Sequence, residues 1–237
     1  MTSTVGGRLR ISTIAAAALA AVLGVLADPR SSQAETQISV YGGANTNLSS
    51  PGTLVKGGFS ETRDFDWEGK SFQMPPYWGA TITHWWNRGP SWGLALDFTH
   101  AKAYADLDFA TDPTYSHLEF TDGNNLLMLN LMYRFNPVLD GKLTPFVGIG
   151  AGIAIPHVEV KLKQPANSPD TWEYQFAGGA GQVLAGLEYN LNESWSVFAA
   201  GKLSYSHLAT DLEGGGRFKT YLWSPQIAIG LSYRFGN

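Results

Sequence analysis

The chain contains no cysteine, which excludes a disulfide framework, a thiol nucleophile and a thiolate metal site. Basic residues are also scarce: beyond residue 34 there are 13 Lys and Arg against 19 Asp and Glu, so no basic surface for nucleic acid is expected. No apolar run of 18 residues follows residue 34, which excludes a helical membrane protein. The abundant glycine and aromatic residues are instead compatible with a β-barrel.

The first 34 residues differ from the rest of the chain. Arg8 and Arg10 precede an apolar segment, 11–27, and Ser32-Gln33-Ala34 supplies the small residues that a signal peptidase requires. We therefore predict a secretory signal peptide over 1–34 and a barrel domain over 35–237. Cleavage after Ala27 is the alternative. An uncleaved membrane helix is disfavoured because the apolar segment is short.

The stretch 126–135 alternates along its length. Leu127, Leu129, Leu131, Tyr133 and Phe135 form one apolar face, and the opposite face includes Asn130 and Arg134. An amide and a guanidinium suit the partly polar interior of a small closed barrel. Residues 226–235 repeat the pattern, and both stretches end in Tyr-Arg-Phe.

Eight such alternating segments are expected, each long enough for a tilted strand to cross a bilayer: 37–47, 76–87, 92–105, 123–136, 144–159, 174–191, 195–207 and 222–235. Short turn-rich connections (87–91, 136–143, 192–194) alternate with long polar ones (48–74, 106–122, 160–173, 208–221). This is the pattern of an all-β, eight-stranded antiparallel up-and-down transmembrane barrel of the outer membrane, with both termini periplasmic and the long loops extracellular.

Aromatic residues mark the ends of the segments beside the short turns, where an interfacial girdle is expected: Trp85, Trp86, Trp92, Tyr133, Phe135, Tyr189, Trp195, Tyr233 and Phe235. A soluble β-sandwich would also alternate, but it would not gather its aromatics at one end of every strand.

An eight-stranded barrel is filled by its own side chains, so Gly148, Gly150 and Gly152 are expected to make room for bulky neighbours such as Phe198. Function should then lie at the outer rim.

Four of the five histidines fall near the expected outer ends of strands: His100, His117, His157 and His207. Carboxylates accompany them: Asp97, Glu119, Asp122, Glu159, Asp211 and Glu213. Imidazole and carboxylate ligands without thiolate suit Fe, Mn or Zn, so a divalent or redox metal is predicted. The metal-ligand candidates are His100, His117, Glu119, Asp122, His157, Glu159, Asp211 and Glu213, and the catalytic candidates are His100, His157, Glu159 and His207. The alternative is a solvated rim with unrelated histidines. His84 is expected to lie near the short turns, at the opposite end of the strands, as an imidazole at the membrane interface.

Two Ser-His pairs, Ser116-His117 and Ser206-His207, superficially suggest a hydrolase. Adjacent strand residues point to opposite faces, so neither serine is placed for activation by its neighbour.

The outer connections carry more acids than bases. Such an acidic rim would repel phosphate-rich lipopolysaccharide unless divalent cations bridged the two or the headgroup had lost a phosphate.

Seven stretches of this chain resemble the lipid A oxidase family of rhizobial-type outer membranes: 64–77, 92–106, 118–123, 144–148, 156–159, 192–198 and 211–216. They are spread over most of the chain beyond residue 34, largely in loops and rim segments that a barrel pattern does not dictate. The resemblance implies a Gram-negative outer-membrane oxidoreductase acting on lipopolysaccharide. Its reaction would use dioxygen to oxidise the proximal glucosamine of 1-dephosphorylated lipid A to 2-aminogluconate.

Within these stretches Trp67, Lys70, Lys102 and Tyr104 are candidates to bind the sugar headgroup. The partners expected are lipid A and the outer membrane, with the chain acting as a monomer. A non-catalytic barrel that serves as an adhesin, a structural protein or a lipopolysaccharide-binding protein is the main alternative. A lipid A deacylase is the third.

Overall fold

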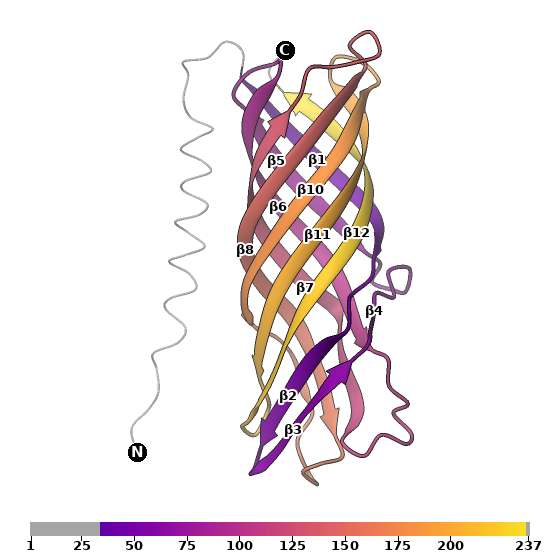
Figure 1. Cartoon of the computed structure of the whole chain (residues 1–237), viewed down its shortest axis with the longest axis vertical. Coiled ribbons are helices and arrows are strands. Elements are labelled where there is room, and N and C mark those ends of the chain that lie inside the picture. Colours follow the sequence, from indigo (N-terminus) through magenta and orange to yellow (C-terminus); the bar gives the residue numbers. More distant parts are fainter. Residues whose placement is uncertain (1–33, 236–237) are drawn as a thin grey trace, which may run out of the picture.

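The computed structural model describes residues 34–235, and the predicted signal peptide, apart from Ala34, therefore lies outside the described residues. Eight antiparallel strands follow one another around a closed barrel, and β1 pairs with β12 to complete the ring (Figure 1). The strands are β1 (Glu35–Asn45), β5 (Trp78–Trp85), β6 (Ser91–Ala105), β7 (Tyr115–Arg134), β8 (Leu143–Leu162), β10 (Gly178–Asn190), β11 (Trp195–Asp211) and β12 (Arg217–Phe235). This confirms the predicted all-β, eight-stranded antiparallel fold.

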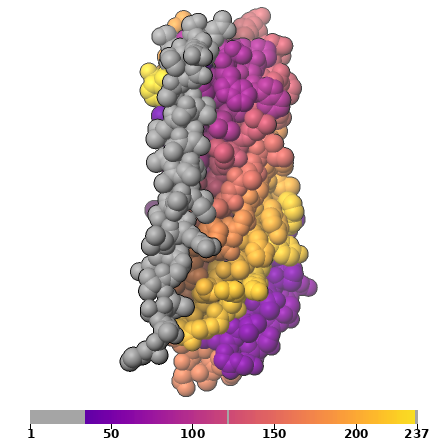
Figure 2. Space-filling view, turned by 90° about the vertical axis from the view of Figure 1, so that its left-hand side faces the viewer, coloured from indigo at the N-terminus to yellow at the C-terminus, as the bar shows by residue number. Residues whose placement is uncertain are grey.

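Four short strands extend the barrel at its long-loop end. The hairpin β2 (Ser50–Lys56) and β3 (Phe59–Phe65) pairs with the start of β12, while β4 (Trp67–Glu68) pairs with β6 and β9 (Thr171–Tyr174) pairs with β8. The sequence predicts loops for these segments and a start at 123 for the fourth long strand, which instead begins at Tyr115. The Gly57-Gly58 turn between two short β-rich runs was the hairpin signal that could have corrected this. In Figure 2 the hairpin lies against β12 at one end of the molecule.

The alternation expected for β7 is confirmed. Leu126, Met128, Asn130, Met132 and Arg134 are all buried, whereas the residues between them face outward. The Arg134 guanidinium pairs with Glu35 at 2.7 Å, so its charge is compensated inside the barrel.

Glycines on the inward face of β8 make room for large side chains, as expected. A Cβ at Gly148 would lie 2.4 Å from Met132 Sδ, and one at Gly150 would meet the Asn130 amide. Phe198 packs instead against Gly230 of the neighbouring β12, and its contact with β8 is to the Phe146 ring, at 6.3 Å between centroids.

The half of the barrel near the long loops has an apolar interior. The β2–β3 hairpin and β4 close over it, and Trp67 and Phe65 are the large rings that they insert. The remaining buried members are Leu54, Ala103, Ala105, Tyr115, Leu118, Phe120, Leu126, Met128, Ala154, Val158, Val160, Ala177, Leu208, Leu212, Phe218 and Leu222. The rim is therefore a packed structure and not an open, solvated ring.

Aromatic side chains form two rings on the outer wall. Trp86, Trp92 and Trp195 are exposed beside the short turns, together with Tyr189, Phe135 and Phe235. Trp85 departs from the prediction: it points inward, donates a hydrogen bond to Gln37 and lies under the Arg134 guanidinium. The second ring is nearer the long loops and consists of Trp78, Trp172, Tyr174, Phe176 and Trp223.

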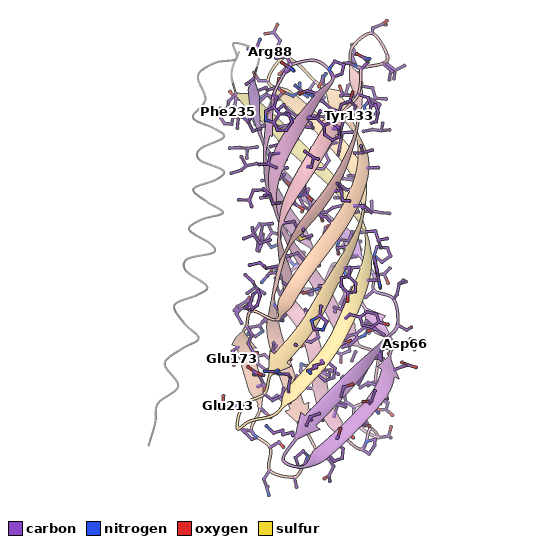
Figure 3. All side chains as sticks on the ribbon, turned by 60° about the vertical axis from the view of Figure 1, so that its left-hand side comes forward. Asp66, Arg88, Tyr133, Glu173, Glu213 and Phe235 are labelled. Carbon is purple, nitrogen blue, oxygen red and sulfur yellow. The ribbon has the colours of Figure 1, made fainter. Side chains whose placement is uncertain are left out.

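Between the two rings the outer wall is apolar, with exposed Val40, Ile82, Leu131, Ile149 and Ile227. This band has the character of a lipid-facing surface. Figure 3 shows the two ends: Arg88, Tyr133 and Phe235 lie at the short-turn end, and Asp66, Glu173 and Glu213 lie at the long-loop end. Helices long and apolar enough to cross a membrane do not occur among residues 34–235.

Candidate functional site

The candidate site lies on the outside of the barrel, on the parts of β7 and β8 that are level with the second aromatic ring. Leu118 and Phe120 on β7, and Val158 and Val160 on β8, point into the apolar interior. Because side chains alternate along a strand, the residues between them face the opposite way. His117, Glu119, His157 and Glu159 therefore share the outer wall, and Glu119 pairs directly with Glu159 across the two strands.

Glu159 is the centre of this cluster and is only 1% exposed. His157 Nδ1 donates a hydrogen bond to Glu159 Oε1 at 2.7 Å, and His117 Nε2 lies 3.5 Å from Glu159 Oε2. His117 Nε2 also donates to Glu119 Oε1 at 2.7 Å. These bonds to Glu119 and Glu159 raise the pKa of His117 to about 9. One buried carboxylate thus joins two imidazoles from different strands.

A bulge in β7 adds a further carboxylate to the cluster. The register slips between Glu119 and Asn124, so residues 120–123 of β7 oppose only 157–158 of β8. Gly123 has a φ of +119° at this point, a conformation that other residues rarely adopt. The bulge brings Asp122 Oδ2 to 3.9 Å from His157 Nδ1. Bulges are common beside active sites because they redirect side chains in this way.

Strand β9 adds two aromatic walls. It pairs with β8 so that Trp172 lies opposite Glu159 and Tyr174 lies opposite His157. The Trp172 ring stacks on His117 at 6.0 Å, and the Tyr174 ring centroid is 4.6 Å from that of His157. The Tyr174 hydroxyl donates to the Asp122 carbonyl at 2.9 Å and so ties β9 to the bulge. Trp172 and Tyr174 are 54% and 58% exposed, so the cluster is bounded by rings that a ligand can reach.

The donor atoms fall into two groups, each compact enough to hold one metal ion. His117, Glu119 and Glu159 form one, and Asp122, His157 and Glu159 form the other, with the ligand atoms of each group within 4.8 Å of one another. Nitrogen and oxygen donors of this kind suit Fe, Mn or Zn. Five of the eight predicted metal-ligand candidates are therefore brought together.

The other three candidates lie apart from these two groups. His100 on β6 is buried beside Trp78, and its Nδ1 contacts Asn125 Oδ1 at 2.9 Å. Asp211 pairs with Arg217 at 2.7 Å, and Glu213 lies in the β11–β12 turn, where its backbone N–H bonds to Thr171. Asp97 is not at the rim at all, because it lies inside the barrel against Lys202.

His207, a catalytic candidate, is exposed on β11, which is separated from β8 by β10. The neighbouring Ser206 is buried on the inward face and accepts a hydrogen bond from Asn124. The two residues thus face opposite ways, as the sequence analysis argued.

Two of the four headgroup-binding candidates are near the cluster on the outer wall. The Tyr104 ring lies 6.3 Å from His117, and Lys70 Nζ lies 2.9 Å from the centre of that Tyr104 ring. Lys102 is buried and donates to the carbonyls of Gln73 and Pro75, so it holds the first long connection in place.

Trp67 also lies out of reach, because its ring is buried in the apolar interior and its indole N–H donates to Ser50. In contrast, the sequence analysis missed Trp172 and Tyr174. Their alternation in Thr-Trp-Glu-Tyr is a short-strand signal, but four residues give little periodicity to detect.

A family model for the outer membrane protein β-barrel domain matches residues 14–235 of this chain. The protein is therefore an outer-membrane β-barrel of that family. A comparison with curated protein sequences finds no match.

Solved structures of other small barrels are similar to this chain at low identity. Neisserial surface protein A is 12% identical, and the match covers 86% of this chain and 98% of the neisserial chain, with a TM-score of 0.41. The attachment invasion locus protein Ail of Yersinia pestis is 13% identical over 86% of this chain and 99% of its own, also with a TM-score of 0.41. The outer membrane protein AlkL is 15% identical, and the match covers 88% of this chain and 94% of the AlkL chain, with a TM-score of 0.48.

Proposed function

We propose that this protein is an enzyme that oxidises the proximal glucosamine of 1-dephosphorylated lipid A to 2-aminogluconate with dioxygen. The observation that carries the proposal is the position of the histidine–carboxylate cluster. It lies on the lateral wall at the second aromatic ring, and aromatic rings of this kind mark the level where lipid headgroups meet a barrel. The seven stretches that resemble lipid A oxidases supply the substrate and the reaction.

In this proposal both termini are periplasmic and the long loops are extracellular, because short periplasmic turns and long outer loops are the rule for such barrels. The cluster then faces the outer leaflet, where lipid A resides. Acyl chains would lie along the apolar band, while the sugar meets His157, Glu159 and the exposed ring of Trp172. The outer connections as a whole carry more acids than bases, and this balance favours a headgroup that has lost its 1-phosphate.

The proposed reaction removes two electrons and two protons from C1 of the glucosamine hemiacetal, giving a lactone. Dioxygen takes up both electrons and both protons and becomes hydrogen peroxide. Water then opens the lactone, so the product gains one oxygen atom overall. A group of the cluster would accept the proton from the C1 hydroxyl, and a redox metal held by its imidazoles and carboxylates would supply the one-electron chemistry that triplet dioxygen requires.

The test is incubation of the purified barrel with 1-dephosphorylated lipid A in air, followed by mass spectrometry. We expect a gain of one oxygen atom with every acyl chain retained, and release of one hydrogen peroxide per turnover. Glu159→Gln and His157→Ala should lower the rate at least a hundredfold. His84→Ala is the control, because His84 lies on the outer wall at the short-turn end and contacts Thr36.

Other outcomes would decide against the proposal. Loss of a fatty acid would identify a deacylase instead. An unchanged lipid A, in every phosphorylation state tried, would leave a non-catalytic barrel that binds lipopolysaccharide or another surface.

A further inference from the structure

We infer that the outer-wall cluster binds two metal ions side by side, with the Glu159 carboxylate as the bridge between them. One ion would take His117 and Glu119, and the other would take His157 and Asp122. The inference deepens the proposed function, since it concerns the same cluster, but it rests on ligand geometry alone and holds whatever reaction the site catalyses.

The first argument is the symmetry of the two donor groups. Each has one imidazole and one carboxylate of its own, and each shares Glu159. The two oxygens of Glu159 face different imidazoles: Oε1 is 2.7 Å from His157 Nδ1, and Oε2 is 3.5 Å from His117 Nε2. A carboxylate that presents one oxygen to each side is the usual bridge in two-metal sites, where the ions are about 3.5–4 Å apart.

The second argument is burial. Glu159 is almost fully buried, and burying a carboxylate is costly unless cationic groups compensate it. Within the described residues its ion-pair partners are the two histidines, and Lys102 acts on it electrostatically only from beyond ion-pair distance. Two divalent ions would compensate Glu159, Glu119 and Asp122 together, which two imidazoles do only in part.

The third argument is the local construction of the backbone. The β7 bulge at Gly123 breaks regular pairing and brings Asp122 Oδ2 to 3.9 Å from His157 Nδ1. The bulge therefore adds to the second donor group the carboxylate that makes it match the first, and redirecting a side chain in this way is a common role of bulges beside functional sites.

The experiment counts ions in the full chain, refolded in detergent without lipopolysaccharide, which itself carries divalent cations. Manganese(II) is added after chelation, free ions are removed, and bound manganese is measured by mass spectrometry. Wild type should retain two ions per chain, His117→Ala one, His157→Ala one and Glu159→Gln none. His207→Ala, an exposed histidine two strands away, should retain two. The shift in gel mobility on boiling verifies that each variant is folded.

Electron paramagnetic resonance gives an independent reading. In wild type, coupling between adjacent ions should suppress the six-line signal of isolated manganese(II), and that signal should reappear in His117→Ala. One ion in wild type that both histidine variants abolish would overturn the inference in favour of a single site. No retained ion would show that the cluster is an ion-pair network only. Because no lipid substrate is present, failure here is distinct from failure of the proposed oxidation.

Discussion

At the scale of single residues, the protonation of His117 is the most direct consequence of the cluster. In the metal-free protein, hydrogen bonds to Glu119 and Glu159 raise its pKa to about 9, above the value of about 6.5 in an unfolded chain. The stability that the charged imidazole contributes is therefore complete below about pH 6.5 and is lost as pH rises through 9. NMR of labelled histidine side chains should place the His117 midpoint near 9.

Glu119→Gln should move this midpoint toward its ordinary value, because the first of the two carboxylates is then gone. Glu213→Gln is the matched control, since Glu213 lies outside the donor groups and should leave the midpoint in place. A wild-type midpoint near 6.5 would contradict the hydrogen-bonding pattern of the cluster.

At the scale of elements, the β7 bulge determines whether Asp122 reaches the site. A Cβ at Gly123 would lie 2.5 Å from Asn125 Oδ1 and 2.6 Å from His100 Nδ1, at a φ of +119° that strains any other residue. Gly123→Ala should therefore displace the bulge, lower the rate of oxidation and reduce the retained metal from two ions per chain to one. The barrel should remain folded, because the strands below the bulge are unchanged.

Gly58→Ala is the control for backbone strain, since Gly58 has a φ of +83° but nothing within 4 Å of an added Cβ. It should leave activity and metal retention unchanged while slightly destabilising the β2–β3 turn. Equal losses in both variants would show that the bulge has no special role.

At the scale of the whole molecule, a buried ion pair joins opposite sides of the barrel interior. Lys202 Nζ lies 2.7 Å from Asp97 Oδ2, and Tyr41 and Thr81 donate to Oδ1 of the same carboxylate. Lys202→Met would leave Asp97 buried without its counter-ion, at a cost of about 3–5 kcal/mol. Urea unfolding in detergent, followed by tryptophan fluorescence, should show this loss.

The double variant Asp97→Leu with Lys202→Met should recover much of the lost stability, because no unpaired charge then remains. A Lys202→Met barrel within about 1 kcal/mol of wild type would mean that water reaches the pair, in conflict with its burial.

The sequence by itself determined the barrel. Alternation with period two specifies which side chains face lipid, and strand order in an antiparallel ring follows chain order, so the eight strands of the ring could be placed from local patterns alone. His157 and Glu159 could also be assigned to one face, because they are two apart on the same strand.

Only the tertiary structure decided which residues meet. The pairing of β7 with β8 brings Glu119 against Glu159, and the bulge at Gly123 brings Asp122 to His157, but register and bulges depend on contacts between distant segments. The same long-range packing separates His207 from the cluster, buries Trp67 under the β2–β3 hairpin and supplies Trp172 from β9. Periodicity assigns a side chain to one face of its strand. A site also requires that its side chains lie at the same level along the barrel axis and next to one another, and these two properties are fixed only when the barrel closes.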